Sequence, residues 1–104
     1  MARLVIAPRA ITDVRDILTL LADKGGNSVA EDYFERFRST FERLVAHPRS
    51  GGPRPRLGRA VRIAVVQPYI VIYRTSIDDV MIMRVLHGRR KITRRTVTER
   101  TGPS

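Results

Sequence analysis

The chain has 104 residues, a length that suits one domain with a single small hydrophobic core. It contains no cysteine, which excludes disulfides, thiolate metal sites and thiol catalysis. Apolar residues make up 42% of the chain, too large a share for a disordered protein, and no apolar run approaches the length of a membrane span. Residues 1–7 lack the apolar core of a signal peptide, so we expect a cytoplasmic protein.

The charge is distributed unequally between the two halves of the chain. Residues 1–48 carry seven basic and seven acidic side chains, whereas residues 49–104 carry thirteen basic and three acidic ones. The whole net charge of +10 therefore belongs to the second half. Thirteen cations in this segment exceed what solubility needs, and a positive surface speeds the encounter with an acidic partner. The sequence predicts binding to nucleic acid or to an acidic protein surface.

Two amphipathic helices are predicted after a short first strand at residues 2–7. Apolar residues recur at helical spacing over residues 8–24, and Gly25 and Gly26 end this pattern. Ser28 and Glu31 fit the capping-box pattern that begins a second helix, and this helix ends near His47, the residue before a proline. A short connection between the two helices predicts an antiparallel helical hairpin.

Three further strands are predicted at residues 59–66, 69–75 and 80–87, with connections short enough for an antiparallel meander. The order β-α-α-β-β-β predicts an α+β fold in which the helical hairpin packs on one face of an antiparallel sheet. We expect one domain over residues 1–91 and a basic C-terminal tail over residues 92–104. The tail is compatible with a short helical turn or with disorder in the free protein.

Most aromatic residues are predicted to lie in the core. Phe34, Phe37 and Phe41 share the apolar stripe of the second helix, and Tyr69 and Tyr73 share one face of a strand. Modules that bind nucleic acid usually combine positive charge with exposed aromatic rings or a reading helix. Direct sequence-specific reading of DNA is therefore disfavoured.

Arg84 interrupts a strand that is otherwise apolar from Val80 to Leu86. Strand alternation places it on the same side as Val80, Ile82 and Leu86. A charge in such a strand must be paired or must face an open cleft. Two alternatives remain at this point: an ion pair with a helix carboxylate such as Asp13 or Asp16, or a functional role.

The ordered motifs resemble those of the RelE/ParE toxin superfamily of type II toxin–antitoxin systems, and the ParE branch more than RelE. The resemblance covers roughly residues 2–91. The stretches that carry it are Pro8 with Ala10 and Asp13-x-x-Asp16-Ile17; the helix from Ala30 through Tyr33 to Leu44; Pro48-x-x-Gly51 and Leu57-Gly58-Arg59-x-Val61-Arg62; Tyr69-x-Val71-x-Tyr73-Arg74; and Ile82-x-Arg84-Val85-Leu86-His87-Gly88-Arg89-Arg90.

The resemblance implies a toxin without a cofactor. A cognate antitoxin, ParD-like and acidic, would hold it inactive in a hetero-oligomer. For the ParE branch the implied target is DNA gyrase, which the toxin inhibits by protein binding. We expect the target-binding residues at the exit of the last strand: Arg84, His87, Arg89, Arg90 and Lys91. A small domain of this kind leaves a sheet face or an edge strand incompletely covered, which an antitoxin arm can cover with a strand or an amphipathic helix.

The alternative is a RelE-like endonuclease that cleaves mRNA in the ribosome, with Arg62, Arg84 and Arg89 binding phosphate. RelE-like nucleases commonly have a tyrosine just after the last strand, and no tyrosine follows Tyr73 here. Arginine is a poor proton acceptor, which leaves His87 as the only general base in the region. No metal site is expected, because two histidines forty residues apart and no cysteine are too few ligands. A basic accessory domain without toxicity is a third possibility.

Overall fold

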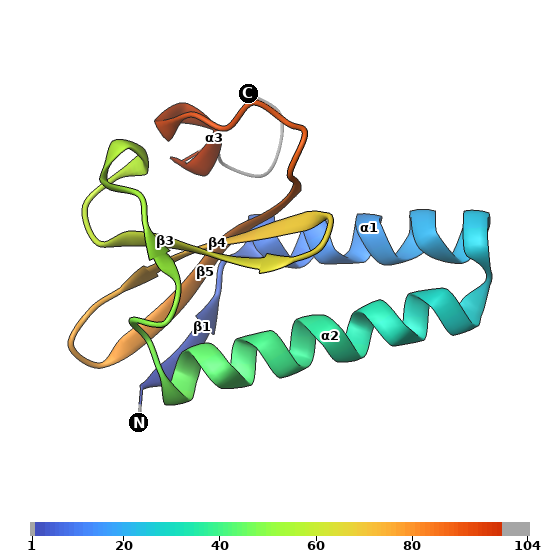
Figure 1. Ribbon diagram of the computed structural model, residues 1–104, viewed down its shortest axis with the longest axis horizontal. Helices are drawn as coiled ribbons and strands as arrows, with labels where there is room; N and C mark the ends of the chain where they lie inside the picture. Colours follow the sequence, from blue (N-terminus) through green and yellow to red (C-terminus); the bar gives the residue numbers. More distant parts are fainter. Residues whose placement is uncertain (1, 99–104) are drawn as a thin grey trace.

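A five-stranded sheet with two long helices on one face dominates the computed structural model, which describes residues 2–98 (Figure 1). A short third helix covers part of the opposite face. The elements in chain order are β1 (Arg3–Ile6), α1 (Pro8–Gly25), α2 (Asn27–Ala46), β2 (Gly52–Pro53), the 3-10 helix η1 (Pro55–Leu57), β3 (Val61–Val66), β4 (Tyr69–Thr75), β5 (Asp79–His87) and α3 (Arg94–Thr98).

The α+β class and the antiparallel meander of β3, β4 and β5 are confirmed. The strand order is β1-β5-β4-β3-β2, and β1 pairs with β5 in parallel, so the sheet is mixed and not wholly antiparallel as predicted. The helical hairpin explains this difference, because it provides the long crossover that a parallel pair needs. The two-residue strand β2 was not predicted, since Gly52 and Pro53 lie in a loop-like Gly/Pro-rich segment.

The helical hairpin turns at one residue. α1 ends at Gly25 and α2 begins at Asn27, so Gly26 alone connects them, with a φ of 88° that L side chains rarely adopt. The predicted capping box is wrong: α2 begins one residue before Ser28, and no side chain caps its N-terminus. The far end of the hairpin extends well beyond the sheet (Figure 1).

Two hydrophobic clusters lie on the two faces of the sheet. The larger one joins the sheet to α1 and α2, and its buried members are Ala10, Phe37, Phe41, Leu44, Ala64, Val66, Tyr69, Val71, Tyr73, Val80, Ile82 and Val85. The smaller one joins the sheet to η1 and α3, and its buried members are Leu57, Val61, Ile72, Met83, Leu86 and Val97. The sheet therefore packs on both faces, which agrees with the nearly uniform apolar character of β5.

A bulge in β5 changes the predicted sides of its residues. Ile72 of β4 lies opposite Arg84, whereas the next β4 residue, Tyr73, lies opposite Ile82, so Met83 is the extra residue. Ile82 therefore belongs to the cluster under the helices, while Leu86 belongs to the cluster under α3. The prediction that Arg84 shares one side with Val80, Ile82 and Leu86 is wrong for Val80 and Ile82, because strict alternation fails at the bulge. Arg84 and Leu86 both lie on the side of α3.

The beginning of the segment expected as a tail packs on the domain. Val97 of α3 is 3% exposed, and Ile92 packs against the same cluster. Residues 99–104, the rest of the predicted tail, lie outside the described residues. The boundary at residue 91 stays a prediction, but α3 contributes to the second cluster of the sheet.

Tyr73 connects the sheet to the loop that follows α2. Its hydroxyl donates to the carbonyl oxygen of Pro48 at 2.8 Å and accepts from the backbone N–H of Gly51 at 2.9 Å. A Cβ atom on Gly51 would lie 2.4 Å from the carbonyl oxygen of Ile63 and 2.5 Å from the Tyr73 hydroxyl. The loop can approach the sheet this closely only because residue 51 has no side chain.

We predict that Gly51→Ala lowers the free energy of unfolding by about 3 kcal/mol, since the added methyl group meets backbone and a buried hydroxyl. Urea denaturation measures this loss. Gly52→Ala is the matched control, because its Cβ would meet only the flexible Arg54 side chain, at 3.1 Å. We expect a change below about 1 kcal/mol for the control. Equal losses in the two variants would contradict the argument.

Candidate functional site

The exit of β5 carries most of the residues predicted to bind the target. β5 ends at His87, and the chain turns there, with the N–H of Arg90 donating to the His87 carbonyl oxygen at 3.0 Å. The His87 Nδ1 atom accepts from the N–H of Arg89, also at 3.0 Å. Arg89, Arg90 and Lys91 are all exposed. We call residues 87–91 the strand-exit segment; it presents three neighbouring cations on a turn that His87 holds in place.

Two tyrosines, Tyr69 and Tyr33, pack in series behind the His87 ring. The His87 ring meets the Tyr69 ring edge-on, with ring centroids 5.7 Å apart. Tyr33 of α2 packs edge-on against Tyr69 and donates its hydroxyl to the carbonyl oxygen of Gln67. Burial raises the pKa of the Tyr69 phenol, and the neighbouring Tyr33 raises it further. Tyr69 is therefore protonated at neutral pH and does not act as a base beside His87.

Arg84 does not reach this surface. It is 1% exposed, and its Nε and Nη2 atoms donate to the Asp13 carboxylate at 2.7 and 3.1 Å. Its Nη1 atom donates to the carbonyl oxygen of Thr96 in α3 at 2.8 Å. Of the two alternatives that the sequence left open for Arg84, the structure contains the ion pair with Asp13. Arg84 can influence the strand-exit segment only by positioning the chain on either side of it.

The three arginines considered for phosphate binding are not brought together. Arg62 lies opposite Tyr73, at the other end of β3 from Val66, and donates to the carbonyl oxygens of Arg49 and Gly51. Arg84 is buried in its ion pair, and Arg89 lies beyond the end of β5. A phosphate group at one of these arginines would not meet the other two.

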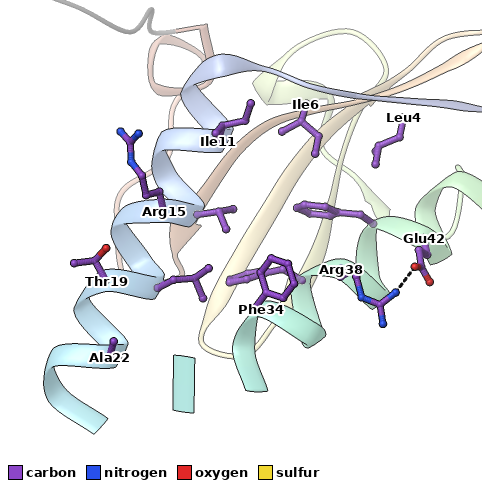
Figure 2. A pocket seen from close by; sticks show the side chains of 13 residues that line it. Leu4, Ile6, Ile11, Arg15, Thr19, Ala22, Phe34, Arg38 and Glu42 are labelled. Carbon is purple, nitrogen blue, oxygen red and sulfur yellow. Dashed lines mark hydrogen bonds and ion pairs between the residues drawn. The ribbon is translucent and has the colours of Figure 1, made fainter. Parts of the chain in front are cut away.

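A second candidate surface is an apolar groove between α1, α2 and β1, with a volume of about 780 Å³ (Figure 2). Its lining is mostly aliphatic and aromatic: Leu4, Ile6, Ile11, Val14, Arg15, Leu18, Thr19, Ala22, Phe34, Phe37, Arg38, Phe41 and Glu42. Phe37 and Phe41 form the buried floor, whereas Ile11 and Phe34 are about half exposed. The prediction that all three phenylalanines lie in the core is therefore wrong for Phe34.

The groove was not predicted as a site from the sequence. The signal was present in the two amphipathic stripes, which together carry more apolar surface than one short sheet can cover. Whether Phe34 faces the sheet or the groove depends on how the two helices are rotated, which a single sequence does not determine. β1, whose Leu4 and Ile6 line the groove, is also an edge strand of the sheet.

Charged side chains flank the groove on the α2 side. Arg38 contacts Glu35 at 2.6 Å and Glu42 at 2.5 Å. Its hydrogen bond to Glu35 lowers the pKa of that carboxyl group. These groups are exposed, so the ion pairs add little stability, but they present both signs of charge beside an apolar surface.

Within residues 2–98, no three His, Asp or Glu side chains gather where they could hold a metal ion. None of the helices in this range combines the length and the apolar character needed to cross a bilayer.

The arrangement defines a small α+β protein with an apolar groove on its helical hairpin and cations at the exit of its last strand. The family described as "ParE toxin of type II toxin-antitoxin system, parDE" matches residues 4–92. The chain belongs to this family.

Two proteins of Caulobacter vibrioides are similar in sequence. Toxin ParE3 is 36% identical over 86 residues, which cover 82% of this chain and 86% of that protein. Toxin ParE1 is 33% identical over 82 residues, which cover 79% of this chain and 84% of that protein. A solved structure titled "Chromosomal ParDE TA system from P. aeruginosa" contains a chain with the same fold, with a TM-score of 0.72 at 19% identity. The match covers 84% of this chain and 96% of that one.

We predict that Asp13→Ala lowers the free energy of unfolding by about 3–5 kcal/mol, because it leaves the buried Arg84 charge without its carboxylate. Thermal or urea unfolding measures this. The double variant Asp13→Asn with Arg84→Met removes both charges and should be clearly more stable than Asp13→Ala. Asp16→Ala, an exposed acid on the same helix, is the control and should change stability by less than about 0.5 kcal/mol. An Asp13→Ala variant as stable as this control would contradict the assignment.

Proposed function

We propose that this protein is the toxin of a type II module that inhibits DNA gyrase by binding to it, and that a ParD-like antitoxin neutralises it. The observation that carries the proposal is the strand-exit segment, in which Arg89, Arg90 and Lys91 are exposed on an ordered turn. The proposed site of action is the cytoplasm, where gyrase works.

The strand-exit segment is suited to binding and not to acid–base catalysis. Three cations within three residues attract an acidic or phosphate-bearing surface, and guanidinium groups hold such surfaces through paired hydrogen bonds. His87, the only histidine of the segment, accepts a hydrogen bond at Nδ1 that holds the turn. We therefore propose His87, Arg89, Arg90 and Lys91 as target-binding residues and Arg84 as a positioning residue beneath them.

The apolar groove is the proposed antitoxin-binding surface. An amphipathic helix could place its apolar face against Phe34 and Ile11, which the toxin alone leaves half exposed. A carboxylate on such a helix would meet Arg15 at the groove wall. The groove and the strand-exit segment are lined by different residues, so variants can separate neutralisation from toxicity.

Arg89→Ala with Arg90→Ala should relieve inhibition of gyrase supercoiling while antitoxin binding is retained. Loss of two guanidinium groups at the target contact should raise the half-inhibitory concentration at least about tenfold, equivalent to about 1.4 kcal/mol. A supercoiling assay with purified gyrase measures this. Arg36→Ala with Arg43→Ala removes the same charge from exposed positions on α2 and is the matched control.

Two results would contradict the proposal. One is unimpaired supercoiling at excess wild-type protein, and the other is equal inhibition by the strand-exit and control variants. Cleavage of mRNA on programmed ribosomes would instead support the RelE-like alternative.

Phe34→Asp should weaken antitoxin binding about 30-fold or more, because it places a charge at the centre of an apolar interface. Supercoiling inhibition should be unchanged. Leu20→Asp is the control, since Leu20 is 49% exposed on the same hairpin and does not line the groove. Titration calorimetry with the antitoxin compares the two variants. Equal effects of Phe34→Asp and Leu20→Asp would show that the antitoxin binds elsewhere.

A further inference from the structure

A second concentration of cations lies on η1, on the residues that flank η1, and on α3. Its members are Arg54, Arg56, Arg59, Arg94 and Arg95, all exposed, and we call them the basic face. Within the basic face, the arginines at η1 and those on α3 are about 35 residues apart in the chain. They come together because η1 and α3 pack against each other on the sheet face opposite the helical hairpin (Figure 1). η1 precedes β3, whereas the strand-exit segment lies near the end of β3, so Arg54, Arg56 and Arg59 lie at the opposite end of β3 from that segment. Arg94 and Arg95 follow the segment in the chain and lie on α3, which packs against η1.

Buried contacts fix the basic face to the sheet. Leu57 of η1 and Val97 of α3 belong to the same hydrophobic cluster and are 5% and 3% exposed. The Arg84 Nη1 atom holds α3 through the carbonyl oxygen of Thr96, and Arg74 donates its Nε–H to the carbonyl oxygen of Arg59 at 3.2 Å. The arginine side chains therefore project from backbone that is already ordered, which lowers the entropic cost of binding.

Among residues 2–98, no carboxylate pairs with the basic face. The sequence has no Asp or Glu between residues 43 and 77 or between residues 80 and 98. Within the described part of the chain, none of the five arginines forms an ion pair with a carboxylate, whereas on α2 Arg36 pairs with Asp32 and Arg38 pairs with two glutamates. Two of the hairpin's arginines are thus balanced by neighbouring carboxylates, whereas no carboxylate of residues 2–98 balances the five arginines of the basic face.

We propose that the basic face binds the phosphate backbone of double-stranded DNA without sequence preference. All five cations are arginines, whose planar forks match phosphate oxygens. Aromatic side chains are absent from the face, since the tyrosines and phenylalanines lie on α2 or in the cluster under the helices. The face therefore lacks the stacking surface that single-stranded nucleic acid requires, and it has nothing with which to read bases.

This inference goes beyond the proposed function and does not depend on the identity of the inhibited enzyme. If the target is gyrase, which acts on duplex DNA, the basic face would add a DNA contact to the protein contact made by the strand-exit segment. The combined contact with gyrase and its DNA rests on the proposed function, so the experiment below uses the toxin with DNA and without gyrase.

Fluorescence anisotropy with a short labelled DNA duplex, over a range of salt concentrations, tests the proposal with the full chain. Because each phosphate contact contributes about 0.9 to the slope of log K against log salt, Arg94→Gln with Arg95→Gln should reduce the slope by about 1.8. The affinity should fall at least about tenfold at moderate salt. Arg56→Gln with Arg59→Gln should act in the same direction.

The matched control is Arg36→Gln with Arg43→Gln, which removes the same net charge from the hairpin. It should leave the slope nearly unchanged, and thermal unfolding should show that all variants are folded. Equal losses in the hairpin and basic-face variants would overturn the proposal, because binding would then follow net charge alone. So would the absence of duplex binding, or tighter binding to single strands or to an acidic polypeptide. DNA binding without gyrase inhibition would refute the proposed function and leave this inference standing.

Discussion

The carboxylate of Asp13 is the point on which the arrangement of helices, sheet and C-terminal segment depends. β1 pairs with β5 only as far as Ile6 and Ile82, after which the chain turns into α1 and leaves the edge of β5 without a strand partner. Asp13 takes the place of a strand partner there, because its carboxylate accepts a hydrogen bond from the backbone N–H of Val85 at 3.0 Å. The same carboxylate accepts the two hydrogen bonds from Arg84. One side chain of α1 thus completes the edge of β5 and neutralises the arginine that holds α3.

The uneven charge of the sequence becomes an uneven charge on the two sides of the sheet. The neutral first half forms the helical hairpin, where cations and carboxylates pair within α2. The basic second half forms η1, α3 and every strand of the sheet except β1, and the described arginines there have few carboxylates nearby. An acidic partner is consequently attracted to the side away from the hairpin, and an apolar partner to the groove on the hairpin.

Periodicity and turn chemistry were enough to predict the helices and the meander, because these depend on local sequence. Both helices end within one residue of the prediction, at Gly25 and Ala46. Features that depend on tertiary contacts were not predicted: the parallel pairing of β1, the exposure of Phe34, and the bulge at Met83. The candidate surfaces differ in the same way. The family resemblance and the basic residues after the last strand indicated the strand-exit segment, which stays a prediction, whereas the groove depends on how the helices pack and was not predicted.

Arg84 shows why a run of basic residues cannot be read as one surface. It lies three residues before His87 in the same strand, yet burial changes abruptly between Leu86, which is 4% exposed, and His87, which is exposed. A buried guanidinium without a carboxylate would cost several kcal/mol, roughly the scale that unpaired buried charges impose, so Arg84 requires Asp13. The exposed arginines that follow have no such requirement within the fold, which leaves their charge available for a partner.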